Sequence, residues 1–320
     1  MKISKIKILA IIGLAAVLIL PFVTDNYIKG VCIQACIYTI LALSLNLVTG
    51  YAGQLVLGHA AFYGIGAYAT ALLMIHLKCN FFIAIVVAMA VTGFFGFLLS
   101  LPTLKLKGDY LAIVTLGFGE IVRLVFVNWT SLTRGPLGLS GIGKPSLFGF
   151  VCADYTAFYL LTMAFLVFTI FFMSRLVKSG LGMCMTCVKA DEIATESIGI
   201  QPIKYKRLAF VLSAAFAGMA GGLYASYITF ISPTTFVYNT SVTILAMVVL
   251  GGLASIPGTV LGALALTIIP EVLRFLNDYR MLIYGILMVV MMIYRPQGFY
   301  GAEKRVRNVF KKQMKKGEAK

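Results

Sequence analysis

The side chains that could do chemistry inside the apolar parts of this chain lie in two short stretches. The first, NLVTGYAGQLVLGHAAFYGIG, begins at Asn46 and places Gln54 and His59 within apolar sequence. Such side chains are costly in lipid unless they face a neighbouring helix or a water-filled cavity. Gly50 and its neighbouring glycines permit a broken helix, whose free backbone groups suit a zwitterionic solute. Asn46, Gly50, Gln54 and His59 are therefore candidate pathway residues, although close helix packing explains the glycines as well.

The second stretch, DYLAIVTLGFGEIVRLVFVNW, holds an acid and a base near the middle of an apolar run. Glu120 and Arg123 are three residues apart, so on one helix they face the same side and can pair. An isolated charge at this depth is expensive, whereas a pair can satisfy itself. We expect either a pathway pair that meets a solute or a structural ion pair that fixes the rotation of the helix.

A third stretch, from Ser174 to Arg207, concentrates charge between two long apolar runs. Residues 190–198 have helical periodicity with two distinct faces. At about 100° per residue, one face comprises Asp191, Glu192, Thr195 and Glu196, and the other Ile193, Ala194, Ser197 and Ile198. Acidic residues suit the start of a helix. Gly199 supplies a stop and Pro202 prevents continuation. The pattern predicts a short, capped, amphipathic helix.

The composition indicates what positions these residues. The chain is 60% hydrophobic and 12% charged, with a mean hydropathy of +0.96, whereas a soluble domain carries roughly a quarter of charged residues. We therefore predict an all-α, polytopic membrane protein. The net charge of +16 does not indicate nucleic-acid binding, because Lys and Arg gather at the ends of apolar runs.

About 20 apolar residues cross a bilayer. The sequence predicts about ten transmembrane segments, at 8–23, 31–49, 59–77, 81–101, 110–128, 155–174, 208–230, 240–254, 258–273 and 281–294. With both termini in the cytoplasm, 20 of the 27 Lys and Arg lie inside and six outside, which places loop 175–207 in the cytoplasm. Eight spans are the alternative if 50–58 and 251–258 form re-entrant hairpins.

A single membrane domain is expected over residues 1–303, followed by a basic tail over 304–320 that faces anionic lipid. No set of about four metal ligands, no complete nucleotide-binding motif and no acid–base cluster is present in the sequence. The chain is expected to be no enzyme and to bind no metal or cofactor. Such a chain is either driven by separate ATPases or works as a secondary carrier without one.

Five motifs carry a family resemblance, in one order from about residue 40 to 301. They are LNLVTGYAGQLVLGHAAFYGIGAYAT, GDYLAIVTLGFGEIVRLV, DEIATESIGI, VVLGGLASIPGTVLGA and YRPQGFYG. In these the chain resembles the LivM-type permease of branched-chain amino acid importers of the ATP-binding-cassette (ABC) class. The resemblance implies a plasma-membrane (inner-membrane) protein of a prokaryote. It also implies a LivH-type partner permease, two ABC ATPase subunits and an external solute-binding protein.

The resemblance further implies that Asp191–Gly199 is a coupling helix that docks on an ATPase subunit. The positions it assigns to coupling are Asp191, Glu192, Ala194, Glu196 and Gly199. Just before this helix the family usually has the pattern G-R-A-x-x-A-I-R, where this chain has GMCMTCVK, so one cation is missing and Lys189 replaces the other. Similar permeases also carry urea, amides or other amino acids, so another small solute is the alternative to Leu, Ile and Val.

Overall fold

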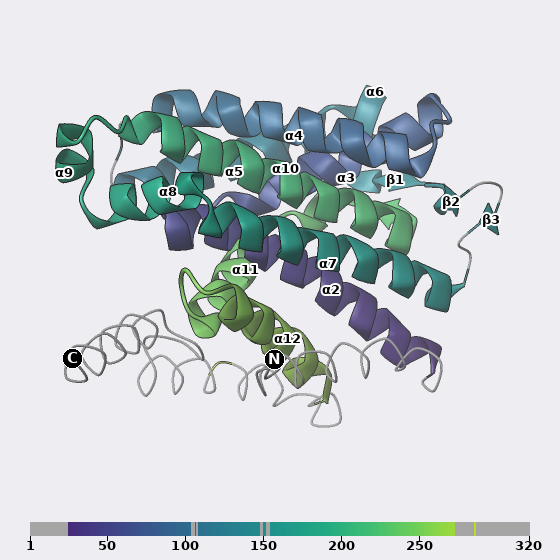
Figure 1. The fold of residues 1–320 in the computed structure, drawn as a ribbon. Helices are drawn as coiled ribbons and strands as arrows, with labels where there is room; N and C mark the ends of the chain where they lie inside the picture. Colours follow the sequence, from purple (N-terminus) through teal and green to yellow (C-terminus); the bar gives the residue numbers. More distant parts are fainter. Residues whose placement is uncertain are drawn as a thin grey trace, which may run out of the picture.

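The computed structural model describes residues 25–103, 106, 108–147, 150–151, 154–272 and 285. Long apolar stretches in these ranges form helices, which run side by side in one bundle (Figure 1). The main helices are α2 (Asn26–Asn46) with the π-helical turn η1 (Leu47–Tyr51), α3 (His59–His76), α4 (Phe81–Thr103), α5 (Asp109–Asn128), α7 (Tyr155–Lys178), α10 (Pro202–Ile228), α11 (Tyr238–Gly251) and α12 (Ile256–Val272).

Short elements lie at the two ends of this bundle. At one end, which we call the α9 end, α8 (Gly180–Ala190) and α9 (Glu192–Ser197) connect α7 to α10. The opposite end holds α6 (Thr130–Thr133), η2 (Gly135–Leu137), η3 (Pro233–Thr235) and two antiparallel strand pairs. The pairs are β1 (Leu139–Ser140) with β4 (Phe230–Ile231), and β2 (Ser146–Leu147) with β3 (Phe150–Val151).

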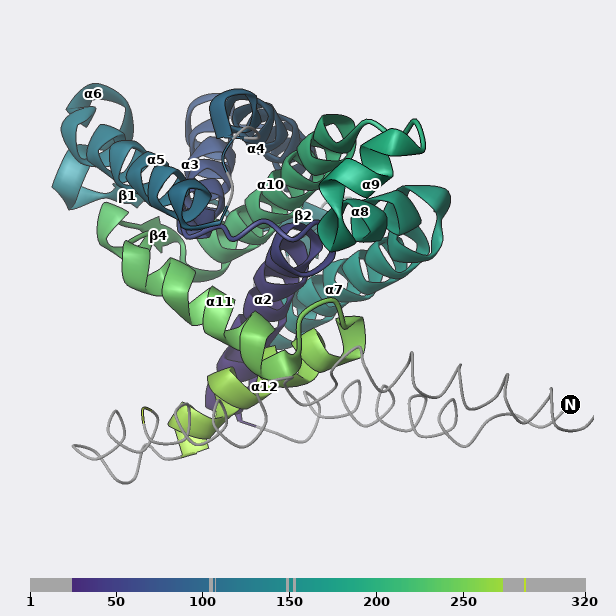
Figure 2. The same ribbon diagram turned by 90° about the vertical axis from the view of Figure 1, so that its left-hand side faces the viewer.

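Helix α10 lies at the centre, where glycines on it and on two neighbouring helices allow close approach. A Cβ at Gly66 of α3 would overlap the backbone of Gly218, and one at Gly96 of α4 would lie 3.1 Å from Phe210 O. Small residues at helix contacts allow this packing in membranes. Figure 2 looks along the bundle from the α9 end and shows α5 and α7 on opposite sides of it.

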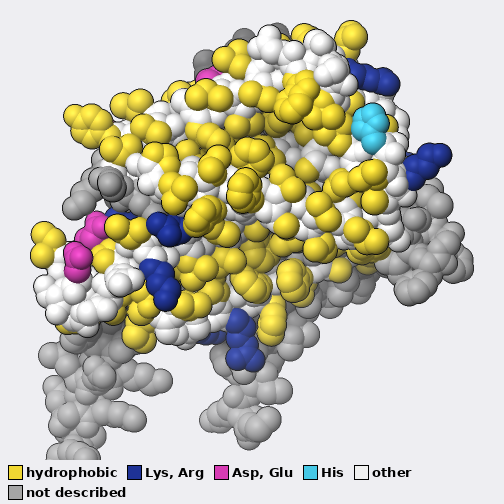
Figure 3. Space-filling model, turned by 90° about the horizontal axis from the view of Figure 1, so that it is seen from above, with side chains coloured by type: hydrophobic (Ala, Val, Ile, Leu, Met, Phe, Trp, Pro, Cys, Tyr) yellow, Lys and Arg dark blue, Asp and Glu magenta, His cyan; other side chains and the backbone are white. Residues whose placement is uncertain are grey.

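The outer surface over α4 is apolar, as a lipid-facing surface should be. Its exposed side chains include Ile83, Val86, Phe94 and Leu98, and Figure 3 shows hydrophobic side chains covering most of this face. Lys and Arg side chains are few in that view. This distribution agrees with the predicted membrane protein.

Six helical stretches among the described residues are long and apolar enough to cross a membrane: Asn26–Tyr51, Phe81–Thr103, Asp109–Asn128, Tyr155–Lys178, Pro202–Ile228 and Pro233–Gly251. The predicted segments 59–77 and 258–273 form α3 and the shorter α12. The segments predicted at 8–23 and 281–294 lie outside the described residues, apart from residue 285. Six such stretches are described, and the predicted total of ten stays a prediction.

Both predicted glycine breaks interrupt helices. After η1 the chain has no regular structure from Ala52 to Gly58, and α11 and α12 are separated by four residues. Ser213, near the middle of α10, donates to Ser44 O at 2.7 Å, and Ser44 Oγ lies 2.8 Å from His59 Nε2. Helix α3 therefore begins level with the middle of α10, partway along the bundle.

Candidate functional site

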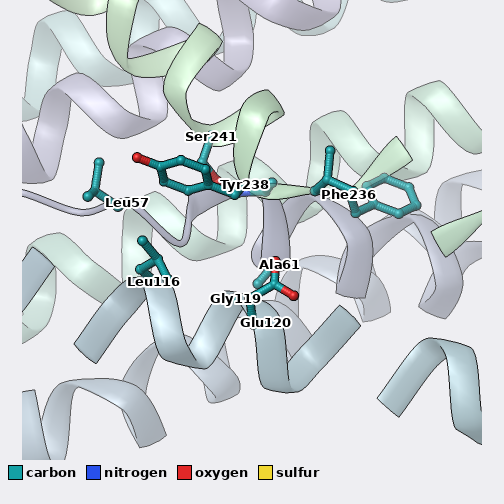
Figure 4. Close-up of a pocket in the computed structure, with 10 residues that line it drawn as sticks. Leu57, Ala61, Leu116, Gly119, Glu120, Phe236, Tyr238 and Ser241 are labelled. Atoms are coloured by element: carbon teal, nitrogen blue, oxygen red, sulfur yellow. Dashed lines mark hydrogen bonds between the residues drawn. The ribbon is translucent and has the colours of Figure 1, made fainter. Parts of the chain in front are cut away.

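A shallow hollow lies where α3 begins, partway along the bundle (Figure 4). The approach to α3, the middle of α5 and the start of α11 all contribute to its wall. The lining residues are Leu57, Ala60, Ala61, Leu116, Gly119, Glu120, Phe236, Val237, Tyr238 and Ser241. Three separate parts of the chain therefore meet at one mid-bundle position, which makes the hollow a candidate pathway site.

The start of α3 is held in place by side chains from two other helices. Ala60 N donates to Ser241 Oγ of α11 at 2.9 Å, and Leu57 N donates to Thr115 Oγ1 of α5 at 3.1 Å. At Gly58 a Cβ would overlap Thr115 O, so only glycine fits there. The first N–H groups of a helix need such partners, and they carry a partial positive charge. The wall of the hollow thus includes the positive end of a helix dipole.

Glu120 and Arg123 form the predicted ion pair on α5. Arg123 Nε donates to Glu120 Oε2 at 2.8 Å, and the two side chains are 31% and 39% exposed, Arg123 first. Glu120 lies beside Ala61 in Figure 4. Partly exposed charges near the middle of a span do not belong in lipid, so this face of α5 must meet protein or water.

The four polar or glycine residues predicted from the first stretch are all buried, and none of them lines the hollow. His59 pairs with Ser44. Asn46 Oδ1 accepts from Ala254 N, between α11 and α12, at 2.9 Å, and Gly50 O accepts from Lys189 Nζ at 2.7 Å. Gln54 is 4% exposed, and neither of its side-chain amide atoms has a partner within the described part of the chain. The structure thus brings only Glu120 of the predicted pathway set to the hollow wall, with Arg123 paired to it.

The amphipathic helix predicted at 190–198 is present as α9, with somewhat narrower bounds. Asp191 is its N-cap, and its carboxylate accepts from Ile193 N and Ala194 N at 2.9 and 3.0 Å. Gly199, at φ +84°, follows the C-terminus as expected. Ala190 belongs instead to α8, because Asp191 adopts an extended backbone between the two helices.

The orientation of α9 is the reverse of that in a soluble protein. Thr195 is buried against the bundle, while Ile193 and Ile198 are 75% and 70% exposed. Lys206 Nζ, on the first turns of α10, lies 2.8 Å from both carboxylate oxygens of Glu192. Glu192 and Thr195 therefore anchor α9 to the bundle, whereas Glu196 and the apolar side are exposed at the α9 end.

Several residues that build these regions gave no signal in the sequence. Tyr238 and Ser241 sit at the start of an apolar run and have no distinctive spacing. Lys206 and Lys189 are ordinary loop cations until the fold brings them to Glu192 and Gly50. Partial burial lowers the pKa of Lys189. Within the described residues, no three His, Cys, Asp or Glu side chains cluster as metal ligands do.

The sequence is similar to a family of transport proteins. The family described as branched-chain amino acid transport system / permease component matches residues 27–292. Two permeases named LivM, of high-affinity branched-chain amino acid transport systems, are similar to this chain. That of Salmonella typhimurium (strain LT2) is 42% identical over 301 residues, which cover 87% of this chain and 71% of the relative.

The LivM permease of Escherichia coli (strain K12) is 41% identical over 318 residues, covering 92% of this chain and 74% of the relative. The LivH permease of the same strain is 24% identical over 288 residues, covering 82% and 91%. No solved structure was found to match. The length of the family match, and the identity to two LivM proteins over most of their length, establish that this chain belongs to the branched-chain amino acid transport permease family.

Proposed function

We propose that this chain is a permease subunit of an ABC importer for branched-chain amino acids in the plasma membrane of a prokaryote. It pairs with a LivH-type permease, receives solute from an external binding protein and is driven by two separate ATPase subunits. The names of its relatives and the distribution of Lys and Arg support this assignment, with the α9 end on the cytoplasmic side. The chain itself carries out no covalent chemistry.

The observation that carries the proposal is the outward-facing apolar side of α9. Ile193 and Ile198 stand exposed at the tip of a capped helix, while Glu192 and Thr195 face the bundle. In water, exposing two isoleucines is unfavourable, so a partner that covers them gains binding energy. An ATPase subunit that docks there can transmit its closure through the Glu192–Lys206 pair to α10.

The hollow beside α3 lies on the route that we propose for the solute. An amino acid zwitterion needs one partner of each sign, and Glu120 and Arg123 offer both on an exposed face of α5. The start of α3 adds a partial positive charge that favours a carboxylate. The remaining wall is mostly apolar or small, as contact with an aliphatic side chain requires, but the hollow holds only about 10 Å³, so a solute passes only when these helices move apart. We therefore assign solute passage to this face of α5.

Substitution of Ile193 by Asp tests the docking role of α9. Cells that carry the complete transport system should lose about tenfold or more of their leucine uptake, because a buried anchor commonly contributes over 1 kcal/mol to an interface. The ATPase subunits should also co-purify less with the permease. Ile193→Leu, which keeps an apolar side chain of equal size, serves as the matched control and should retain uptake.

Two outcomes would overturn the assignment. Unchanged ATP-dependent uptake with Ile193→Asp would contradict docking at α9. Leucine uptake that persists without ATP or the ATPase subunits would identify a secondary carrier. Competition by urea, amides and other amino acids against labelled leucine, measured in the same cells, identifies the solute class.

A further inference from the structure

The two glycine breaks and the loop that carries α9 meet at one point near the α9 end. The first break is η1 and the stretch that follows it, and the second lies between α11 and α12. Asn46 joins them, since its Oδ1 accepts from Ala254 N at 2.9 Å. A Cβ at Gly50 would overlap Asn46 Oδ1 and lie 2.6 Å from Ala254 N. The junction therefore has room only for a glycine at position 50.

The π-helical turn leaves the carbonyl of Gly50 available at this junction. In a continuing α-helix, Gln54 N would donate to Gly50 O. Here Gln54 N donates to Val48 O at 3.0 Å, and Ala52 N donates to Leu47 O at 3.2 Å. Lys189 Nζ takes the vacated position, donating to Gly50 O at 2.7 Å. A charged donor makes a stronger bond to a carbonyl than a neutral one does.

The stem of Lys189 is fitted to the same break. Gly53 has φ +71°, and a Cβ there would lie 2.8 Å from Lys189 Cγ. The bond from Nζ to Gly50 O is partly buried, although the Lys189 side chain as a whole remains partly exposed. Gly53 is thus needed for the lysine stem to lie across the turn.

Lys189 must also move when α9 moves. It occupies the last turn of α8, and only Ala190 separates it from Asp191, the N-cap of α9. Any displacement of α9 by a docked subunit therefore displaces Lys189. Because Asn46 ties the first break to the second, a pull on Gly50 reaches both.

We propose that Lys189 is a positioning residue that transmits the movement of α9 to the two glycine breaks and so controls closure of the pathway at the α9 end. The inference rests on the proposed function, because it assumes that α9 is pushed by an ATPase. In this proposal the broken helix is the part that moves to close the pathway at the α9 end. It also gives a reason for a cation at position 189.

The test uses the complete transporter, with its binding protein and ATPases, reconstituted in liposomes. Lys189→Met keeps the unbranched stem and removes the charged donor. Leucine transported per ATP hydrolysed should fall about fivefold, the effect of losing one net hydrogen bond from a coupled step. Lys189→Arg should retain most of the ratio. Lys204→Met removes an exposed cation from the same loop without touching Gly50 and should leave the ratio unchanged.

A second variant approaches the same contact from the other side. Gly53→Ala should reproduce the loss of coupling, because its Cβ displaces the lysine stem. Gly141→Ala is its matched control, since Gly141 also has positive φ, +80°, but has open space where a Cβ would stand. Both changes place an alanine at positive φ, and only one disturbs Lys189.

The ratio of leucine transported to ATP hydrolysed distinguishes transmission of movement by Lys189 from a merely structural role of this residue. If Lys189→Met leaves leucine per ATP unchanged, the inference is overturned. This holds whether the rates of leucine transport and ATP hydrolysis both stay normal or both fall together with the amount of assembled complex. If the unmodified transporter fails to link leucine uptake to ATP hydrolysis, the proposed function fails and takes the inference with it.

Discussion

Two ion pairs of equal length serve this protein differently. Glu192–Lys206 and Glu120–Arg123 are each 2.8 Å long. The first joins residues 14 positions apart on α9 and α10, and its lysine is 8% exposed. The second joins residues three positions apart on α5, and both of its side chains are about a third exposed.

The difference in span determines what each pair can do. A pair between two helices fixes their relative position, so its loss frees α9 from the bundle. A pair within one helix holds nothing else together and stabilises that helix by only about 0.2–0.5 kcal/mol. Arg123 uses Nε toward Glu120, which leaves its other N–H groups for a further partner. From this difference we propose that the pair at the α9 end acts as a tether and that the mid-bundle pair acts as a docking point for the solute.

The largest effect should follow from Lys206→Met. It removes the ammonium from both carboxylate oxygens of Glu192, which is then held 24% exposed beside an apolar side chain. Loss of a charged hydrogen-bond partner at such a position costs about 1–3 kcal/mol. We expect uptake to be lost and the loop 175–207 to be cut faster by protease in inside-out vesicles.

Lys204→Met provides the control for this change, because Lys204 is exposed on the same turn of α10. Equal uptake by the two variants would show that the tether has no function. In a double-mutant cycle with Glu192→Gln, the two substitutions should be strongly non-additive, since each removes the same contact.

The parts of this architecture that depend on neighbouring residues could be predicted from sequence. Apolar runs indicated α2 to α5, α7 and α10 to α12, since helix periodicity and span length are local properties. The short helix with an acidic start, the stop at Gly199 and the pairing of Glu120 with Arg123 are confirmed for the same reason, whereas the role of Asp191 as the N-cap was not predicted. The predicted roles of these residues in coupling and in the pathway stay predictions.

The contacts between residues far apart in the sequence could not be predicted. Asn46 meets Ala254 across 208 residues, and Lys189 meets Gly50 across 139. No local pattern marks such contacts, so Asn46 and Gly50 were placed in the pathway, whereas the structure buries them at the junction of the two breaks. Helix α8 was missed because Gly180 and Gly182 weaken its helical signal.

Neutralising the mid-bundle pair should have the second-largest effect. Arg123→Gln or Glu120→Gln should lower leucine uptake about tenfold, which corresponds to roughly 1.4 kcal/mol of lost solute interaction. The amount of permease in the membrane and its co-purification with ATPase should not change, because the pair joins no separate elements.

The double variant Glu120→Gln/Arg123→Gln decides between the pathway pair and the structural pair. If the charges bind solute, removing both leaves uptake as low as either single change. If they only neutralise each other, the double variant restores what the single variants lose, since no charge is then left unpaired at mid-span. Recovery of uptake would therefore contradict the docking role.

The smallest effect should come from Asp191→Ala, which separates the fold of α9 from its tether. The change removes the two N-cap hydrogen bonds, worth about 1 kcal/mol together, and leaves Glu192 and Lys206 in place. Because the Glu192–Lys206 pair still orients the helix, we expect uptake to fall only about two- to threefold. Such a decrease corresponds to less free energy than the cap contributes to the stability of the helix. Asp191→Asn keeps a side-chain acceptor at the cap and should retain uptake.

A defect in Asp191→Asn as large as in Asp191→Ala would mean that the charge at position 191, and not the cap, meets the partner. A defect larger than that of Lys206→Met would reverse the ranking and make helix formation, not the tether, the limiting feature of the α9 end.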